Sequence, residues 1–305
     1  MVVDLTVPLQ GYYLVSLDYP GHGLSSRYPA GMMYKMTDGF MFIRRVLDHL
    51  QWDKVTILGH SMGGGVGLWY SAMFPEQVQR IISIDLLSFG ALPLNQHVKS
   101  ARNAIIESIK IQKKLEHPVT PTYSFEDGVA RAFMASNLIT RAFLTSSNET
   151  EQISEESVRT LMKRGLVETE DGSGYTWSAD LRLRVPTAFN MDHDMTEEFA
   201  SKVSCPHLVI KARDSPKYMS DEDYDKLLKV CKYYEMINIV DNDIYNYSQI
   251  FRKNNPNFVY RELEGGHHLH LNTPQPVAQI INKFLAKDFP SFGGDALGGK
   301  PQFDM

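Results

Sequence analysis

Residues 55 to 63 read Val55-Thr56-Ile57-Leu58-Gly59-His60-Ser61-Met62-Gly63 and join an apolar run to a G-x-S-x-G box. The apolar run predicts a strand, and residues 66–74 predict a helix directly after the box. In this order the serine occupies a strained strand-to-helix turn, so glycine is expected two residues before and two after it. We therefore predict that Ser61 is a nucleophile and that the Met62 N–H points at a developing oxyanion.

A Gly-rich turn that binds phosphate is the other interpretation of this segment. The box is followed by Gly64, Gly65 and Gly67, but no lysine follows the glycines as a P-loop would require. The pattern therefore favours the nucleophile.

Strand and helix patterns alternate on both sides of the box. Alternation of this kind predicts an α/β fold with a mainly parallel sheet. Strands are predicted over Tyr12–Leu17, Lys54–Leu58, Gln79–Leu87, His207–Lys211 and Asn257–Leu263. Core helices are predicted over Asp38–Leu50, with Phe42, Val46 and Leu50 on one face, over Asp221–Lys232 and over Pro276–Leu285.

The alternation stops in the middle of the chain, where helical and polar segments predict an inserted cap. Its helices are expected over Val98–Leu115, Phe125–Ser136 and Glu151–Lys163, followed by a turn at Glu170–Gly174. The predicted organisation has four parts: core with the nucleophile turn over 1–87, helical cap over 88–203, core with a histidine loop over 204–290, and a disordered tail over 291–305.

Composition excludes several function classes. The formal net charge is −5 with dispersed basic residues, which argues against a nucleic-acid surface. Two cysteines, Cys205 and Cys231, make no disulfide framework, so we expect a reducing compartment: the cytoplasm, with a peroxisome or another organelle still open. No run reaches the length of a membrane span, and the N-terminus does not read as a signal peptide.

The second catalytic element is the loop Glu264-Gly265-Gly266-His267-His268-Leu269-His270, after the last predicted strand. A serine needs a base within hydrogen-bond reach, and this loop lies at the same carboxyl edge of the sheet as the Ser61 turn. His267 is the predicted base, and His268 and His270 are packing or polar neighbours. No acidic or cysteine ligand follows at matching spacing, so we predict no metal and no cofactor.

Two carboxylates compete as the group that orients His267. Asp85 ends the strand after the nucleophile helix, and Asp214 follows the next core strand. Both keep the chain order Ser…Asp…His.

These elements resemble the α/β-hydrolase superfamily, in particular its serine hydrolase-like (kraken-like) group. Three segments carry the resemblance over most of the chain: Asp18-Tyr19-Pro20-Gly21-His22-Gly23-Leu24-Ser25, Gly59–Gly65 and Glu264–Pro274. The resemblance implies hydrolysis of ester, thioester or amide bonds, with Ser61 as nucleophile and His267 as base. The cap then implies a small or medium apolar acyl substrate as partner, and the oligomeric state stays open.

Two departures from the family pattern matter. Where many members place the acid before a proline, this chain has Ser215 before Pro216, with Asp214 one residue early. Related hydrolases carry the acid at the end of the preceding strand, so we prefer Asp85 and keep Asp214 as the alternative. The family's first strands, and the loop with the second oxyanion donor, would fall before Met1. We therefore expect a gap with unpaired backbone groups beside the strand at Lys54. Two functions follow as alternatives: an active serine hydrolase, or a catalytically impaired hydrolase or non-catalytic binding protein that lacks half of the oxyanion hole.

Overall fold

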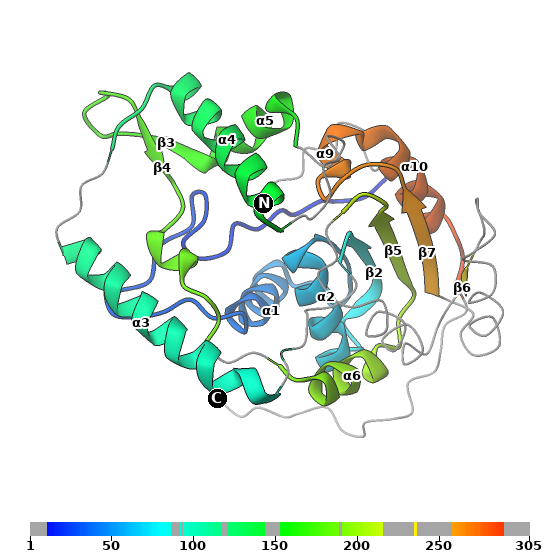
Figure 1. Cartoon of the computed structure of the whole chain (residues 1–305). Coiled ribbons are helices and arrows are strands. Elements are labelled where there is room, and N and C mark those ends of the chain that lie inside the picture. The colour runs from blue at the N-terminus through cyan, green and yellow to red at the C-terminus, as the bar shows by residue number, and fades with distance from the viewer. Residues whose placement is uncertain are drawn as a thin grey trace.

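A five-stranded parallel sheet forms the centre of the molecule (Figure 1). The computed structural model describes residues 11–86, 92, 94–116, 121–143, 153–188, 191–215, 235–236 and 258–289. The strands are β1 (Val55–His60), β2 (Val78–Ile84), β5 (His207–Ala212), β6 (Glu235–Met236) and β7 (Phe258–Leu263), in the order β1-β2-β5-β7-β6. All four pairings are parallel, which confirms the predicted α/β class.

Helices cover both faces of the sheet. The helices α1 (Asp38–Leu50), α2 (Met62–Met73) and α6 (His193–Lys202) lie on one side in Figure 1, and α10 (Pro274–Leu285), with the short α9 (Leu269–Asn272) before it, lies on the other. Helix α1 has the predicted bounds but buries a different face: Phe40, Ile43 and Leu47 are buried. The predicted face, Phe42, Val46 and Leu50, was wrong. Both sets of residues have the spacing of three or four that forms one face of a helix, and packing against α2 buries the set that contains Phe40.

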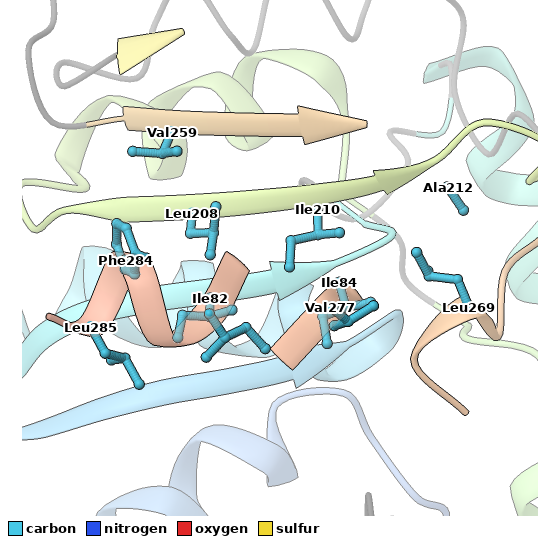
Figure 2. Packing of buried hydrophobic residues seen from close by; sticks show 11 residues of the cluster. Ile82, Ile84, Leu208, Ile210, Ala212, Val259, Leu269, Val277, Phe284 and Leu285 are labelled. Carbon is cyan, nitrogen blue, oxygen red and sulfur yellow. The ribbon is translucent and has the colours of Figure 1, made fainter. Parts of the chain in front are cut away.

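Side chains of β2 alternate between the two layers, as strand geometry requires. Ile81 packs in the cluster that contains Trp69 of α2. Ile82 and Ile84 point the other way, into the cluster that α10 closes with Val277, Phe284 and Leu285 (Figure 2). Each such buried side chain contributes roughly 1.5–3 kcal/mol relative to exposure, so this double-sided packing fixes the strand ends that carry the site.

The segment between β2 and α6 holds the elements of the predicted cap, which lie to one side of the sheet in Figure 1. They are η1 (Leu94–Gln96), α3 (His97–Glu116), α4 (Phe125–Phe143), α5 (Glu155–Gly165), β3 (Leu166–Glu168), β4 (Tyr175–Trp177) and η3 (Leu181–Arg184). The antiparallel hairpin β3–β4 was not predicted, although the turn expected at Glu170–Gly174 lies between its strands. The division of the chain into parts stays a prediction. Because Phe199 of α6 stacks on Trp69 at 4.8 Å, we would place the end of the cap before α6.

A buried arginine of the predicted cap holds residues 28–32 of the N-terminal part of the chain. Arg182 is 8% exposed and pairs with Asp180 at 2.7 Å. Its guanidinium also donates to three backbone carbonyls, those of Tyr28, Pro29 and Met32. Such a planar group with five fixed donors satisfies several acceptors at once, so these contacts hold η3 against residues 28–32.

The strand predicted over Tyr12–Leu17 is not a strand in the structure. Tyr13 and Leu14 are 79% and 63% exposed, and within the described residues β1 pairs with β2 alone. An extended apolar run becomes a strand only when a neighbour satisfies its N–H and C=O groups, and no described strand lies beside it. The helix predicted over 221–232, Cys231, Pro216 and the tail over 291–305 lie outside the described residues.

Candidate active site

The turn around Ser61 has the backbone strain that the box predicts. Ser61 has φ +51° and ψ −123°, one of three non-glycine residues with positive φ in the described chain. A Cβ on Gly59 would lie 2.2 Å from the carbonyl carbon of Gly63, so only glycine fits there. A Cβ on Gly63 would meet no atom within 4 Å, so the expected need for glycine after the serine was wrong. Strain of this kind persists only where the surroundings enforce it.

Backbone hydrogen bonds join successive strand ends beneath the site. The N–H of Ser61 donates to the carbonyl of Ile84 at 2.9 Å, and the N–H of Asp85 donates to that of Ile210 at 2.7 Å. Asp85 itself has φ +54°, which turns its side chain at the end of β2. The nucleophile turn and the candidate acid are therefore held by the same hydrogen-bonded edge.

Asp85 is the carboxylate that contacts the predicted base. Its Oδ2 accepts from Nδ1 of His267 at 2.7 Å and from the Ser215 hydroxyl. Its Oδ1 accepts from Nζ of Lys211 at 2.8 Å and from the Ala212 N–H at 2.9 Å. The carboxylate thus receives four hydrogen bonds while its side chain is fully buried.

The electrostatics of Asp85 follow from these partners. Burial alone would raise the pKa of Asp85. The hydrogen bond from His267 and the positive charge of Lys211 outweigh that effect, so the pKa of this carboxyl lies below its ordinary value. An ionised acceptor requires a hydrogen on Nδ1 of His267, so in the neutral ring Nε2 carries the lone pair that a base needs.

The alternative acid, Asp214, lies elsewhere on the same edge. Its carboxylate accepts from the N–H of Gly265 at 3.2 Å, and its own N–H donates to the Gly265 carbonyl at 3.1 Å. These bonds attach the histidine loop to the end of β5. Of the two candidate acids, Asp85 is the one that is hydrogen-bonded to His267, whereas Asp214 bonds the backbone of Gly265.

Three further imidazoles, those of His60, His268 and His270, gather around the base. The His60 ring lies 4.5 Å from the ring of His267 and 4.0 Å from that of His270, and His268 lies 5.1 Å from His267. Nε2 of His60 donates to the backbone carbonyl of His267 at 2.7 Å, so the residue before the nucleophile holds the loop that carries the base. Among the residues that the structure describes, no His, Cys, Asp or Glu cluster is arranged to hold a metal ion.

Burial keeps these neighbouring imidazoles neutral. Burial and the adjacent ring of His270 hold the pKa of His60 well below its ordinary value. Burial lowers the pKa of His268 to about 4 and that of His270 to about 3. Another buried histidine, His207, lies outside this group, and its Nε2 is hydrogen-bonded with the Ser83 hydroxyl at 2.8 Å.

Met62, the predicted oxyanion donor, is the first residue of α2. The first N–H groups of a helix have no partner inside the helix, and the helix dipole favours negative charge there. Sequence reasoning missed three residues of the site: His60, Lys211 and Ser215. His60 fills a variable position of the G-x-S-x-G box and Lys211 lies near a strand end, so neither belongs to a motif that marks it. Ser215 was considered only because it precedes Pro216, where many family members have the acid.

A family model for the alpha/beta hydrolase fold matches residues 4–274. The chain belongs to the alpha/beta hydrolase fold family. It is 30% identical over 273 residues to a probable serine hydrolase of Drosophila melanogaster, covering 89% of this chain and 72% of the relative. It is 28% identical over 290 residues to the human serine hydrolase-like protein 2, covering 92% of this chain and 82% of the relative.

Solved structures agree with the assignment of the alpha/beta hydrolase fold to this chain. A hypothetical protein of Pseudomonas aeruginosa PAO1 is similar with TM-score 0.64 at 26% identity, covering 88% of this chain and 81% of that one. A thioesterase domain from the curacin biosynthetic pathway has the same fold with TM-score 0.59 at 19% identity, covering 87% of this chain and 78% of that one. The resemblance to the serine hydrolase-like group is confirmed. None of the described helices is long and apolar enough to cross a membrane.

Proposed function

We propose that this alpha/beta hydrolase cleaves ester, thioester or amide bonds of a small or medium apolar acyl substrate. Ser61 is the nucleophile, His267 the base and Asp85 the orienting acid. The observation that carries the proposal is the 2.7 Å hydrogen bond from Nδ1 of His267 to the buried Asp85 carboxylate, at the sheet edge that also holds the strained Ser61 turn. The printed names of the relatives, serine hydrolases and serine hydrolase-like proteins, support the same class.

The reaction has two halves, acylation of Ser61 and hydrolysis of the acyl-serine, and in each half His267 acts first as base and then as acid. The Ser61 hydroxyl attacks the substrate carbonyl while Nε2 of His267 takes its proton, and the Met62 N–H stabilises the negative oxygen. The imidazolium then gives its proton to the leaving alcohol, thiol or amine. Water then attacks the acyl-serine while Nε2 of His267 takes its proton. The bond from the acyl carbon to Oγ of Ser61 breaks as the imidazolium returns that proton to Oγ, and the acid product leaves.

A fluorophosphonate probe tests the nucleophile. The wild type is expected to react covalently at Ser61, located by mass spectrometry of the labelled peptide, and Ser61→Ala is expected to lose the label. Ser71→Ala is a matched control, because that hydroxyl is buried in the same helix and donates to the Leu68 carbonyl. Equal labelling of the wild type and Ser61→Ala would remove Ser61 from the proposal.

A catalytically impaired hydrolase or a non-catalytic binding protein is the second candidate. One observation favours it: within the described residues, β1 has no pairing partner on its outer edge. Loss of one oxyanion donor lowers the rate of a well-studied protease by roughly 10²–10³. Labelling at Ser61 without turnover of p-nitrophenyl acyl esters would support this candidate over the first.

A further inference from the structure

Lys211 forms an ion pair with Asp85, the proposed acid of the site. It is the penultimate residue of β5, and its Nζ lies 2.8 Å from Oδ1 of Asp85 and 3.1 Å from the carbonyl of Ala212. Its side chain is 22% exposed, whereas the Asp85 side chain is fully buried. One carboxylate therefore binds a permanent cation through one oxygen and the imidazole of His267 through the other.

The charges of these three groups decide what the lysine does. Before His267 takes the proton of Ser61, the charges of Lys211 and Asp85 cancel, so the net charge of the three side chains is zero. After the proton transfer their net charge is +1. Without the lysine, the net charge of Asp85 and His267 would change from −1 to zero in the same step. A nearby positive charge disfavours a second one, and the low dielectric of a buried carboxylate strengthens that effect.

We propose that Lys211 is a positioning residue: by bonding Oδ1 of Asp85, its charge weakens the attraction of that carboxylate for the imidazolium formed during catalysis and so sets the acid limb of the pH–rate profile. The inference rests on the proposed serine hydrolase function and deepens it.

The imidazoles packed around His267 can be separated from the effect of Lys211 on the acid limb. His60 and His268 contact the His267 ring, and His270 contacts the ring of His60. Burial holds the pKa of His60 well below its ordinary value, that of His268 at about 4 and that of His270 at about 3. His268 and His270 therefore stay neutral above about pH 5, and burial also disfavours a charge on His60, so we do not attribute a change in the acid limb above that pH to these rings.

Charged groups at the ends of β5 and β7 are paired with one another. Arg213 lies 3.0 Å from Glu262 and 3.3 Å from Glu264, and its side chain is 46% exposed. Asp214 is bonded to the N–H of Gly265. Solvent screens exposed pairs of this kind, so within the described residues Lys211 is the cation coupled to the buried carboxylate.

The rate of fluorophosphonate labelling at Ser61, followed from about pH 5 to pH 9 on the full chain, tests this role without a known substrate. Lys211→Met and Lys211→Gln both remove the charge, and glutamine keeps a donor for Asp85. Both are expected to move the acid limb of the labelling profile up by about one pH unit, so that labelling falls up to tenfold on that limb. Lys211→Arg keeps the charge and is expected to leave the limb in place.

Each other outcome overturns the role. A folded Lys211→Met variant with an unmoved acid limb would exclude it, and so would a glutamine variant that behaves as the wild type, because the hydrogen bond and not the charge would then matter. A moved acid limb in Lys211→Arg, which keeps the charge and so remains informative if the neutral variants do not fold, would exclude it as well. A wild type that is not labelled at Ser61 overturns the proposed function itself, a result distinct from a labelled enzyme whose limb does not move.

Discussion

Asp85→Asn is the substitution that most sharply tests the site, because every neighbour of this carboxylate is a donor. Oδ2 receives hydrogen bonds from His267 and Ser215, and Oδ1 receives them from Lys211 and Ala212. An amide NH₂ therefore meets donors in either orientation. It cannot face the fixed Ala212 N–H and the ammonium, so it turns to His267, whose imidazole can change tautomer.

That change disables the base. With the proton moved from Nδ1 to Nε2, His267 cannot accept the proton of Ser61. Wrong-tautomer variants of a serine protease lose roughly 10⁴ in kcat, which is about 5.5 kcal/mol of transition-state stabilisation. We expect a loss of that size in the hydrolysis of p-nitrophenyl acyl esters.

The matched control is Asp214→Asn. Its carboxylate accepts one N–H, that of Gly265, so we expect less than about a tenfold loss of turnover. Asp85→Asn also leaves the partly exposed Lys211 without its counter-ion, and we expect this to cost roughly 1–3 kcal/mol of stability. Both variants are therefore assayed well below the Tm measured by circular dichroism. A larger loss in Asp214→Asn than in Asp85→Asn would refute the assignment of the acid.

Two further changes test the packing around the site. Gly59→Ala places a Cβ 2.2 Å from backbone and should destabilise the chain by more than about 3 kcal/mol, whereas Gly63→Ala meets no atom and should stay within about 1 kcal/mol in urea unfolding. His270 has a pKa of about 3 in the folded state and about 6.5 unfolded, so the unfolded chain binds its proton first and stability falls as pH drops from about 6.5 towards 3. His270→Phe should flatten that slope by roughly 1 kcal/mol per pH unit, while the exposed His49→Gln should not; equal slopes in both would contradict the assignment.

The sequence predicted the elements that depend on local pattern and missed what depends on neighbours. Ser61 and His267 stand out because a strained turn and a Gly-Gly loop leave a written motif. The choice between Asp85 and Asp214 stayed open because both end strands in the same chain order, and only the side chain that reaches Nδ1 separates them. Tyr12–Leu17 has strand composition, yet pairing partners and not composition make a strand. Lys211 reads as an ordinary strand-end lysine until its ammonium is seen beside a buried carboxylate.

The hydrogen bond from His60 to the carbonyl of His267 has a consequence for evolution and design. Residue 60 occupies a position that the motif writes as x, as though any side chain would serve. Here that side chain connects two segments 207 residues apart in the chain. A substitution at the x position would therefore be inherited together with compensating changes in the histidine loop. A nucleophile box transplanted into another scaffold would need this contact as well as its glycines and serine.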